Sequence, residues 1–185
     1  MIPAVASGSA IRSSTEPVSA DAPKRSKRSA GILAYRRRHG LLEVFLVHPG
    51  GPYWVAKDEG AWSIPKGEYS PEEEPLTAAQ REFREETGLP LTGQFSALPA
   101  VRQASGKEVL AWAVEVADLD PSKLRSNHFT IEWPPHSGVQ RQFPEVDRAS
   151  WFTLAEAEAK LIAGQRPLLK SLTDAIGRDM GGNQP

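Results

Sequence analysis

Cysteine is missing from the 185-residue sequence, which has 22 basic and 23 acidic residues and no long apolar run. Without cysteine there is no disulfide framework, no thiolate zinc site and no cysteine nucleophile. The near balance of charge argues against a nucleic-acid binder driven by bulk charge. Because neither a membrane-length apolar run nor a signal-peptide core is found, we expect a soluble, cytoplasmic protein without a membrane partner.

Residues 1–28 are rich in serine, alanine and proline and end in a basic run at 24–28. This composition predicts a disordered tail, and the basic run is interpreted as solvated, with contact to nucleic acid or a partner as the alternative. The hydrophobic fraction of 39% suffices for one core. We therefore expect one domain at 29–178 and a frayed C-terminus at 179–185.

Short apolar and alternating runs between turn residues predict a mixed succession of strands and helices. Strands are predicted at 29–35, 42–48, 61–64, 95–102, 108–116, 129–133 and 150–153, the first two forming a hairpin. A capping box at 153–156 predicts a helix through Ile162, and Pro167 begins a second amphipathic helix. Residues 134–147 are predicted to form a long loop.

The stretch from Gly67 to Leu89 contains seven glutamates among its 23 residues. Residues 77–87 are good helix formers that precede a glycine stop, so they predict a helix that begins near Pro75. The preceding residues 70–73 resemble a capping box and predict a single turn.

Three of these glutamates, Glu82, Glu85 and Glu86, stand at i, i+3 and i+4 and share one helix face. Like charges so close repel each other, which destabilises the helix or raises their pKa values. A hard divalent cation would remove the conflict, since Mg²⁺ and Mn²⁺ prefer clustered oxygen ligands. The alternative is a solvated acidic face in which Arg81 pairs with Glu85.

The spacing of the whole stretch distinguishes these alternatives. It reads Gly67-x5-Glu73-x7-Arg81-Glu82-Phe83-x-Glu85-Glu86-x-Gly88-Leu89. This pattern fills every position of the Nudix box, so the sequence closely resembles the Nudix hydrolases. The resemblance implies an α/β fold, a Nudix-type α/β/α sandwich with a mixed β-sheet between helices.

The resemblance also implies a metal site within the box. Glu82, Glu85 and Glu86 would coordinate catalytic divalent cations, with the Gly67 carbonyl as a further ligand. The implied cation is Mg²⁺, with Mn²⁺ as the alternative. The implied reaction is attack of water on a diphosphate linkage, in which Glu85 or Glu145 accepts the proton.

The remaining box residues would support this site. Glu73 and Arg81 are implied to form an ion pair that holds the loop against the helix. Gly67 and Gly88 would provide backbone shapes that a side chain would obstruct.

Residues before the box are candidates for substrate contact. Lys66 would meet a substrate phosphate as a point charge, unless it is a surface lysine that satisfies a nearby glutamate. Tyr53 and Trp54, in the loop at 49–60 that follows His48, offer ring faces to a nucleobase. Ordinary packing is the alternative for both rings.

The predicted loop at 134–147 is long enough to be an active-site flap. Nudix hydrolases often recruit an extra acidic residue from a loop before the last strand, as general base or added ligand. Glu145 is the preferred candidate and Asp147 the weaker one. The alternative is that Glu145 only pairs with Arg141 or Arg148.

The same region offers further substrate contacts. Arg141 is a candidate phosphate clamp because its guanidinium can bind two oxygens at once. Trp133 or Phe143 could provide a base-stacking surface, with core packing as the alternative.

The sequence therefore predicts a metal-dependent pyrophosphohydrolase with a small-molecule nucleotide substrate, first of all a nucleoside triphosphate or a diadenosine polyphosphate. Nucleotide sugars, diphosphoinositol phosphates and RNA 5′ ends are the alternative substrates. A domain that binds and senses a nucleotide without hydrolysis is the alternative of another class. The sequence gives no oligomeric state.

Overall fold

The computed structural model describes residues 28–181. The predicted tail, apart from Arg28, and residues 182–185 of the predicted frayed end lie outside the described residues. Arg28 is already the first residue of a strand, and the last helix continues to Gly181. None of the helices in this part of the chain is long and apolar enough to cross a membrane.

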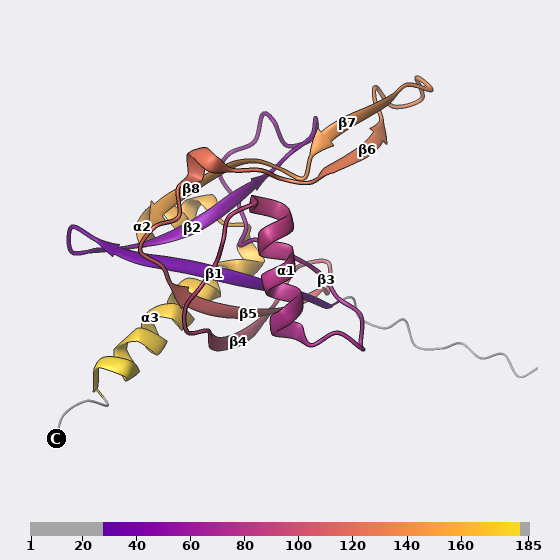
Figure 1. Ribbon diagram of the computed structural model, residues 1–185. Helices are drawn as coiled ribbons and strands as arrows, with labels where there is room; N and C mark the ends of the chain where they lie inside the picture. The colour runs from indigo at the N-terminus through magenta and orange to yellow at the C-terminus, as the bar shows by residue number, and fades with distance from the viewer. Residues whose placement is uncertain (1–27, 182–185) are drawn as a thin grey trace, which may run out of the picture.

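A six-stranded mixed sheet forms the centre of the fold (Figure 1). Its strands are β1 (Arg28–Arg38), β2 (Leu41–Pro49), β3 (Lys66–Glu68), β4 (Ser96–Arg102), β5 (Glu108–Glu115) and β8 (Val146–Thr153). They lie in the order β4-β5-β1-β2-β8, and β3 pairs with β1. Only the β1–β5 pairing is parallel, so the mixed sheet expected from the sequence is confirmed.

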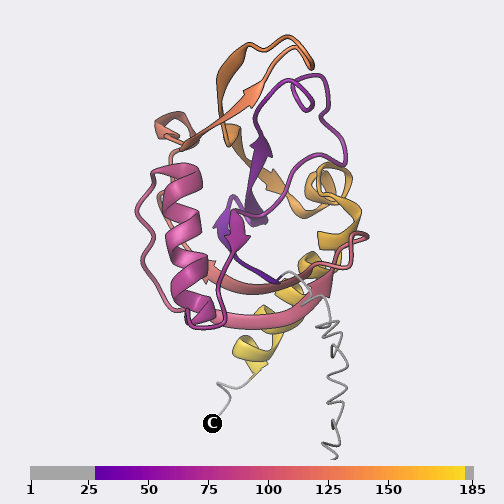
Figure 2. The ribbon, with the colours of Figure 1, turned by 90° about the vertical axis from the view of Figure 1, so that its right-hand side faces the viewer.

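Helices cover both faces of this sheet (Figure 2). Helix α1 (Pro75–Thr87) lies on one face, and α2 (Leu154–Lys160) with α3 (Pro167–Gly181) on the other. Alternation along β1 supplies both cores, since Ile32 packs in the cluster under α1 and Leu33 in the cluster under α3. The predicted α/β/α layering is thus confirmed.

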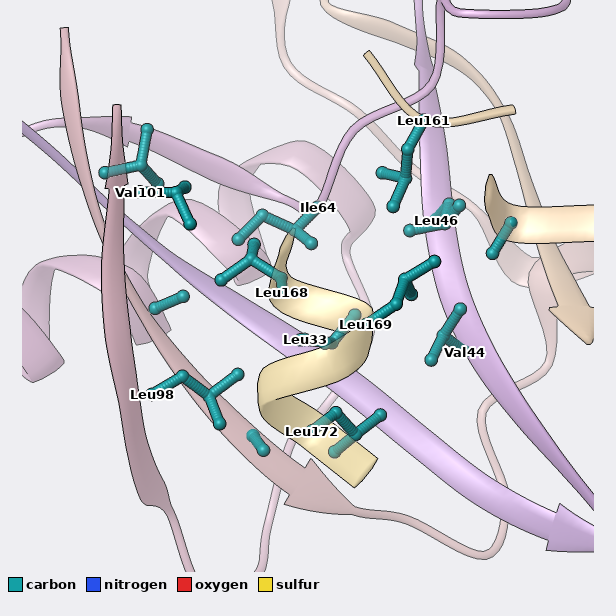
Figure 3. Close-up of a cluster of buried hydrophobic side chains, with 14 of the residues drawn as sticks. Leu33, Val44, Leu46, Ile64, Leu98, Val101, Leu161, Leu168, Leu169 and Leu172 are labelled. Carbon is teal, nitrogen blue, oxygen red and sulfur yellow. The ribbon is translucent and has the colours of Figure 1, made fainter. Parts of the chain in front are cut away.

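The core under α3 is built mainly from aliphatic side chains (Figure 3). Leu33, Leu46, Leu168 and Leu172 are completely buried there. Truncating any one of them to alanine removes apolar contacts and leaves a cavity, a change that typically costs about 2–5 kcal/mol. This core fixes the sheet that carries the residues of the candidate site.

Helix α1 begins and ends close to the predicted positions. Its N-cap is Glu74, whose side chain accepts a bond from the Thr77 amide at 2.7 Å. Gly88 ends it in the left-handed region, with φ of 67°, which glycine adopts without strain. Residues 70–73, which resemble a capping box in the sequence, form a turn. Its Glu73 side chain accepts a bond from Arg81 of α1.

A second, two-stranded sheet corrects the predicted loop at 134–147. Strand β6 (His128–Glu132) pairs with β7 (Gln140–Pro144), and β8 already begins at Val146. Cross-strand contacts stabilise this hairpin, because Phe129 stands opposite Phe143 with ring centroids 6.1 Å apart. Figures 1 and 2 show the hairpin beside the loop between β2 and β3.

Two further predictions need correction. Residues 61–64 form no strand but two isolated bridges, Val47 with Ser63 and Trp62 with Leu161, and the strand lies at β3 instead. Helix α2 has the predicted capping box but ends at Lys160, because Leu161 bridges to Trp62 rather than continuing the helix.

Candidate functional site

Two glutamates of α1 contact the guanidinium of Arg81 on the same helix. Nη1 of Arg81 lies 2.6 Å from Oε1 of Glu82 and 3.2 Å from Oε2 of Glu85. Glu86 has a different partner, because its Oε2 accepts a bond from the Lys66 amide at 3.0 Å. The helix thus presents its carboxylates toward β3.

The expected ion pair between Glu73 and Arg81 is present. Nε of Arg81 donates to one carboxylate oxygen of Glu73 at 3.0 Å, and Nη2 donates to the other at 3.1 Å. Because Arg81 also contacts Glu82, one guanidinium joins the turn before α1 to the carboxylates on it. Such a bidentate contact restricts the geometry more than a lysine could.

Gly67 lies so close to Glu82 that no side chain fits between them. A Cβ atom placed on Gly67 would come 2.0 Å from the Glu82 carboxylate carbon. Backbone and carboxylate therefore approach each other closely, with the Gly67 residue paired to Ala30 of β1. Gly88, the other box glycine, is needed for its positive φ.

Burial raises the pKa of two of these carboxyl groups. The pKa of Glu86 rises to about 7, with Glu82 and Glu145 adding to the increase and Lys66 opposing it. Burial also raises the pKa of Glu82, although Arg81 opposes the change. The ionised forms of these two carboxyl groups are therefore less favourable in the folded protein than in water.

Glu145 belongs to this group electrostatically, since its charge contributes to the raised pKa values of both Glu82 and Glu86. Two hydrogen bonds hold its backbone. The Gly50 amide donates to the Glu145 oxygen at 2.9 Å, and the Glu145 amide donates to the Asn127 oxygen at 2.8 Å. Within residues 28–181 it forms no ion pair with an arginine, so the predicted alternative pairing is wrong.

The arginines named in that alternative lie elsewhere. Arg148 contacts Asp147 at 3.6 Å and Asp58 at 4.0 Å. Arg141 is exposed on β7, opposite Ile131, and makes no ion pair with a described residue. Its guanidinium is therefore available to a ligand.

Aromatic residues of the β2–β3 loop and the β6–β7 hairpin come together. The rings of Tyr53 and Trp133 meet edge to face with centroids 5.1 Å apart, and Tyr53 is 59% exposed. Trp54 instead lies under the Lys57 ammonium at 4.5 Å. Phe143 packs against Phe129, as the packing alternative predicted for it.

One contact in this region was not expected from the sequence. His48 is completely buried and its Nδ1 lies 2.7 Å from Oδ1 of Asp147, 99 residues away in the chain. Asp147 was considered only as a weaker alternative to Glu145. This pair of a buried histidine and a partly buried aspartate is not visible in sequence spacing, because it depends on how β2 and β8 align.

The donor chemistry of the acidic face fits a hard divalent cation. Between residues 28 and 181, however, no three His, Cys, Asp or Glu side chains are already gathered as a ligand group. The contacts explain this, because Glu82 and Glu85 face Arg81 while Glu86 faces the Lys66 amide. A cation would replace the contacts of Arg81 Nη1 and leave the bidentate bond to Glu73 in place.

Comparison with known proteins gives one family. The model described as the NUDIX domain matches residues 25–172. A rat bis(5′-nucleosyl)-tetraphosphatase [asymmetrical], from Rattus norvegicus, is 35% identical over 79 residues, 39% of this chain and 54% of that protein. The chain thus spans about half the length of this curated relative.

Solved structures support the fold. The C. elegans Ap4A hydrolase binary complex has a TM-score of 0.57 at 22% identity, over 82% of this chain and 98% of that one. The NUDIX domain of Shewanella oneidensis NrtR, complexed with ADP ribose, also has a TM-score of 0.57, at 15% identity over 83% and 90% of the two chains. At these identities the likeness concerns the fold alone.

Proposed function

The chain belongs to the Nudix family, as its box predicts, and we propose that it is a divalent-metal-dependent pyrophosphohydrolase for a nucleoside or dinucleoside polyphosphate. The observation that carries the proposal is the shared carboxylate face of Glu82, Glu85 and Glu86, to which Glu145 adds its charge. A non-catalytic binding domain has no need for carboxylates that raise one another's pKa values.

In this proposal Glu82, Glu85 and Glu86 hold the cation, with the Gly67 carbonyl beside them. The cation would neutralise the diphosphate and lower the pKa of a water molecule. Arg81 would keep its bidentate bond to Glu73 and so continue to hold the loop before α1. Mg²⁺ is proposed ahead of Mn²⁺ because oxygen ligands accept both and Mg²⁺ is more available.

Proton transfer would fall to Glu145 or to Glu85. Glu145 has an exposed side chain without an ion-pair partner in the described region, so its carboxylate is free to accept a proton from water. Glu85 is engaged by Arg81 at 3.2 Å. This difference supports Glu145 as the base.

Substrate recognition is proposed to use the loop and the hairpin. Tyr53 and Trp133 would stack on a nucleobase, since stacking on exposed rings is worth about 1–3 kcal/mol per base. Arg141 and Lys66 would contact phosphate oxygens, and Trp54 would form part of the substrate-binding loop. The rat relative and the C. elegans structure, by their names, favour dinucleoside tetraphosphates such as Ap4A as the first substrates to test.

A substrate panel with Mg²⁺ tests the proposal. It should contain Ap4A, nucleoside triphosphates, ADP-ribose as a nucleotide sugar, a diphosphoinositol phosphate and triphosphorylated RNA, with products identified by chromatography. We expect turnover of a nucleoside polyphosphate that disappears with a chelator and falls by a factor of about 100 or more in Glu85→Gln. Binding of nucleotide without any phosphoanhydride cleavage would instead establish a sensing domain.

A further inference from the structure

Both ring nitrogens of the buried His48 face hydrogen-bond acceptors. Nε2 lies 2.8 Å from the backbone oxygen of Lys57, and Nδ1 lies 2.7 Å from Oδ1 of Asp147. A carbonyl oxygen can only accept, so Nε2 donates to Lys57. Nδ1 faces the Asp147 carboxylate, so one buried ring contacts both the β2–β3 loop and β8.

A β-bulge turns Asp147 toward this histidine. His48 stands opposite Arg148, but the next pair is Pro49 with Val146, so Asp147 is the extra residue on β8. Regular alternation would point its side chain to the face covered by α1. Because of the bulge, Asp147 instead reaches His48 and Val146 occupies the α1 core.

The bulge also sets where Glu145 lies. Immediately before Val146, Glu145 is held through its backbone oxygen by the Gly50 amide at 2.9 Å. A shift of one residue in this pairing would move Glu145 relative to the carboxylates of α1. The contact between His48 and Asp147 therefore stabilises the register that presents Glu145.

The other side of the same ring holds the β2–β3 loop. Its bond to Lys57 fixes the segment at 51–56, which carries the exposed Tyr53. The next residue, Asp58, has its own anchors, since it accepts bonds from Trp62 and Lys160. Apart from His48, the only described donor to the backbone oxygen of Lys57 is Arg148, at the longer distance of 3.4 Å.

We propose that His48 and Asp147 form a positioning pair for the hydrolysis proposed above. Through Nδ1 the ring fixes the bulge that presents Glu145, and through Nε2 it fixes the loop that presents Tyr53. Neither residue touches the substrate. The inference rests on the proposed function for its kinetic consequences and on the hydrogen bonds alone for its structural ones.

Two substitutions separate the two sides of the ring. In His48→Asn the amide lies near the position of Nδ1 and can still bind Asp147, but the contact with Lys57 is lost. In His48→Gln the amide lies near the position of Nε2 and can still bind Lys57, but the contact with Asp147 is lost. Glu43→Gln is the matched control, because it breaks a partly buried ion pair with Arg36 at the opposite end of β2.

Steady-state kinetics should split between the variants. We expect about a tenfold higher KM and a kcat within about twofold of wild type for His48→Asn, because loosening the loop weakens binding. We expect about a tenfold lower kcat and nearly unchanged KM for His48→Gln, because Glu145 is misplaced. Equal changes in both variants, or changes no larger than those of Glu43→Gln, would overturn the proposal.

Hydrogen–deuterium exchange supplies a readout that needs no activity. Amides at 51–57 should exchange faster in His48→Asn than in wild type and Glu43→Gln, and amides at 145–147 faster in His48→Gln. Unchanged exchange in both segments would refute the positioning pair even if the enzyme is active. A wild type that cleaves no phosphoanhydride would overturn the proposed function, while this exchange pattern would still decide the inference.

Discussion

The carboxylate of Glu86 is tied to the backbone of Lys66, whose nitrogen lies 3.0 Å from Oε2. This bond joins the end of α1 to β3, at the point where the chain enters the box. Burial nevertheless raises the pKa of Glu86 to about 7, from an ordinary value of 4.5. The folded protein therefore holds a proton there that the unfolded chain releases at lower pH.

Without metal, stability should consequently decrease as the pH rises. The raised pKa of Glu86 stabilises the folded protein fully at pH values below 4.5, the pKa of this group in the unfolded chain. This stabilisation is lost as the pH rises through about 7. Between pH 5 and 8 the unfolding free energy should fall by roughly 3 kcal/mol. Urea denaturation in a chelator should show this fall in wild type and a much smaller one in Glu86→Gln.

The exposed Glu158 of α2 gives the control, and Glu158→Gln should keep the wild-type dependence on pH. If the unfolding free energy falls equally with pH in wild type and in Glu86→Gln, the Glu86 carboxyl group does not titrate as its burial implies. Mg²⁺ added at pH 8 should restore the lost stability in wild type, because a ligand that binds only the folded state stabilises it.

Gly67→Ala should remove activity while leaving the fold intact. The new methyl group would clash with the Glu82 carboxylate. The flexible Glu82 side chain can avoid this clash only by giving up its position in the candidate metal site. We expect kcat/KM with Mg²⁺ to fall by about 100-fold, with a nearly unchanged melting temperature. Gly177→Ala in α3 is the control, because it meets no atom within 4 Å and should stabilise the helix by up to about 1 kcal/mol.

Arg81→Lys should raise the Mg²⁺ concentration needed for half-maximal activity. A lysine cannot keep two bonds to Glu73 and also contact Glu82, so the loop and the carboxylates lose their common partner. Loss of such a supporting contact typically costs about 10–100-fold in metal affinity. Titration with Mg²⁺ measures the effect, and Arg84→Lys, on the exposed side of α1, should leave the titration unchanged.

Glu145→Gln should reduce kcat more than it changes KM, because a base acts in the transition state. The acidic limb of the pH–rate profile should change shape, since a glutamine cannot accept the proton. Glu59→Gln, an exposed position in the β2–β3 loop, should keep both parameters. A wild-type profile in Glu145→Gln would transfer the role of base to Glu85.

Local signals in the sequence were enough for the box and its helix. Gly88 and Pro75 bracket α1, and the spacing of Glu82, Glu85 and Glu86 places them on one face, because helix periodicity is a local property. The capping box at Thr153 was visible for the same reason. These elements were predictable without knowledge of their neighbours.

Long-range pairing was not predictable in the same way. Trp62 and Ser63 look like strand residues, but each finds a single bridge to a different partner, Leu161 and Val47. Strand β7, the partner of the predicted strand at 129–133, was missed because Pro134 and Pro135 suggested a loop, although they lie only at the turn of the hairpin. The bulge at Asp147 is set by the alignment of two distant strands, which no local spacing encodes.

Recognition of the substrate's nucleobase can be tested directly at one side chain. Trp133 directly follows β6, and its ring centroid lies 5.1 Å from that of Tyr53 in the β2–β3 loop. Trp133→Leu should raise KM for a nucleoside polyphosphate by about tenfold, because a stacked base is worth about 1–3 kcal/mol. Inhibition by inorganic tripolyphosphate, which has phosphates but no base, should be unchanged. Val139→Ala, at the exposed hairpin tip, should alter neither quantity, so a parallel weakening of both ligands in Trp133→Leu would mean that the ring only supports the hairpin.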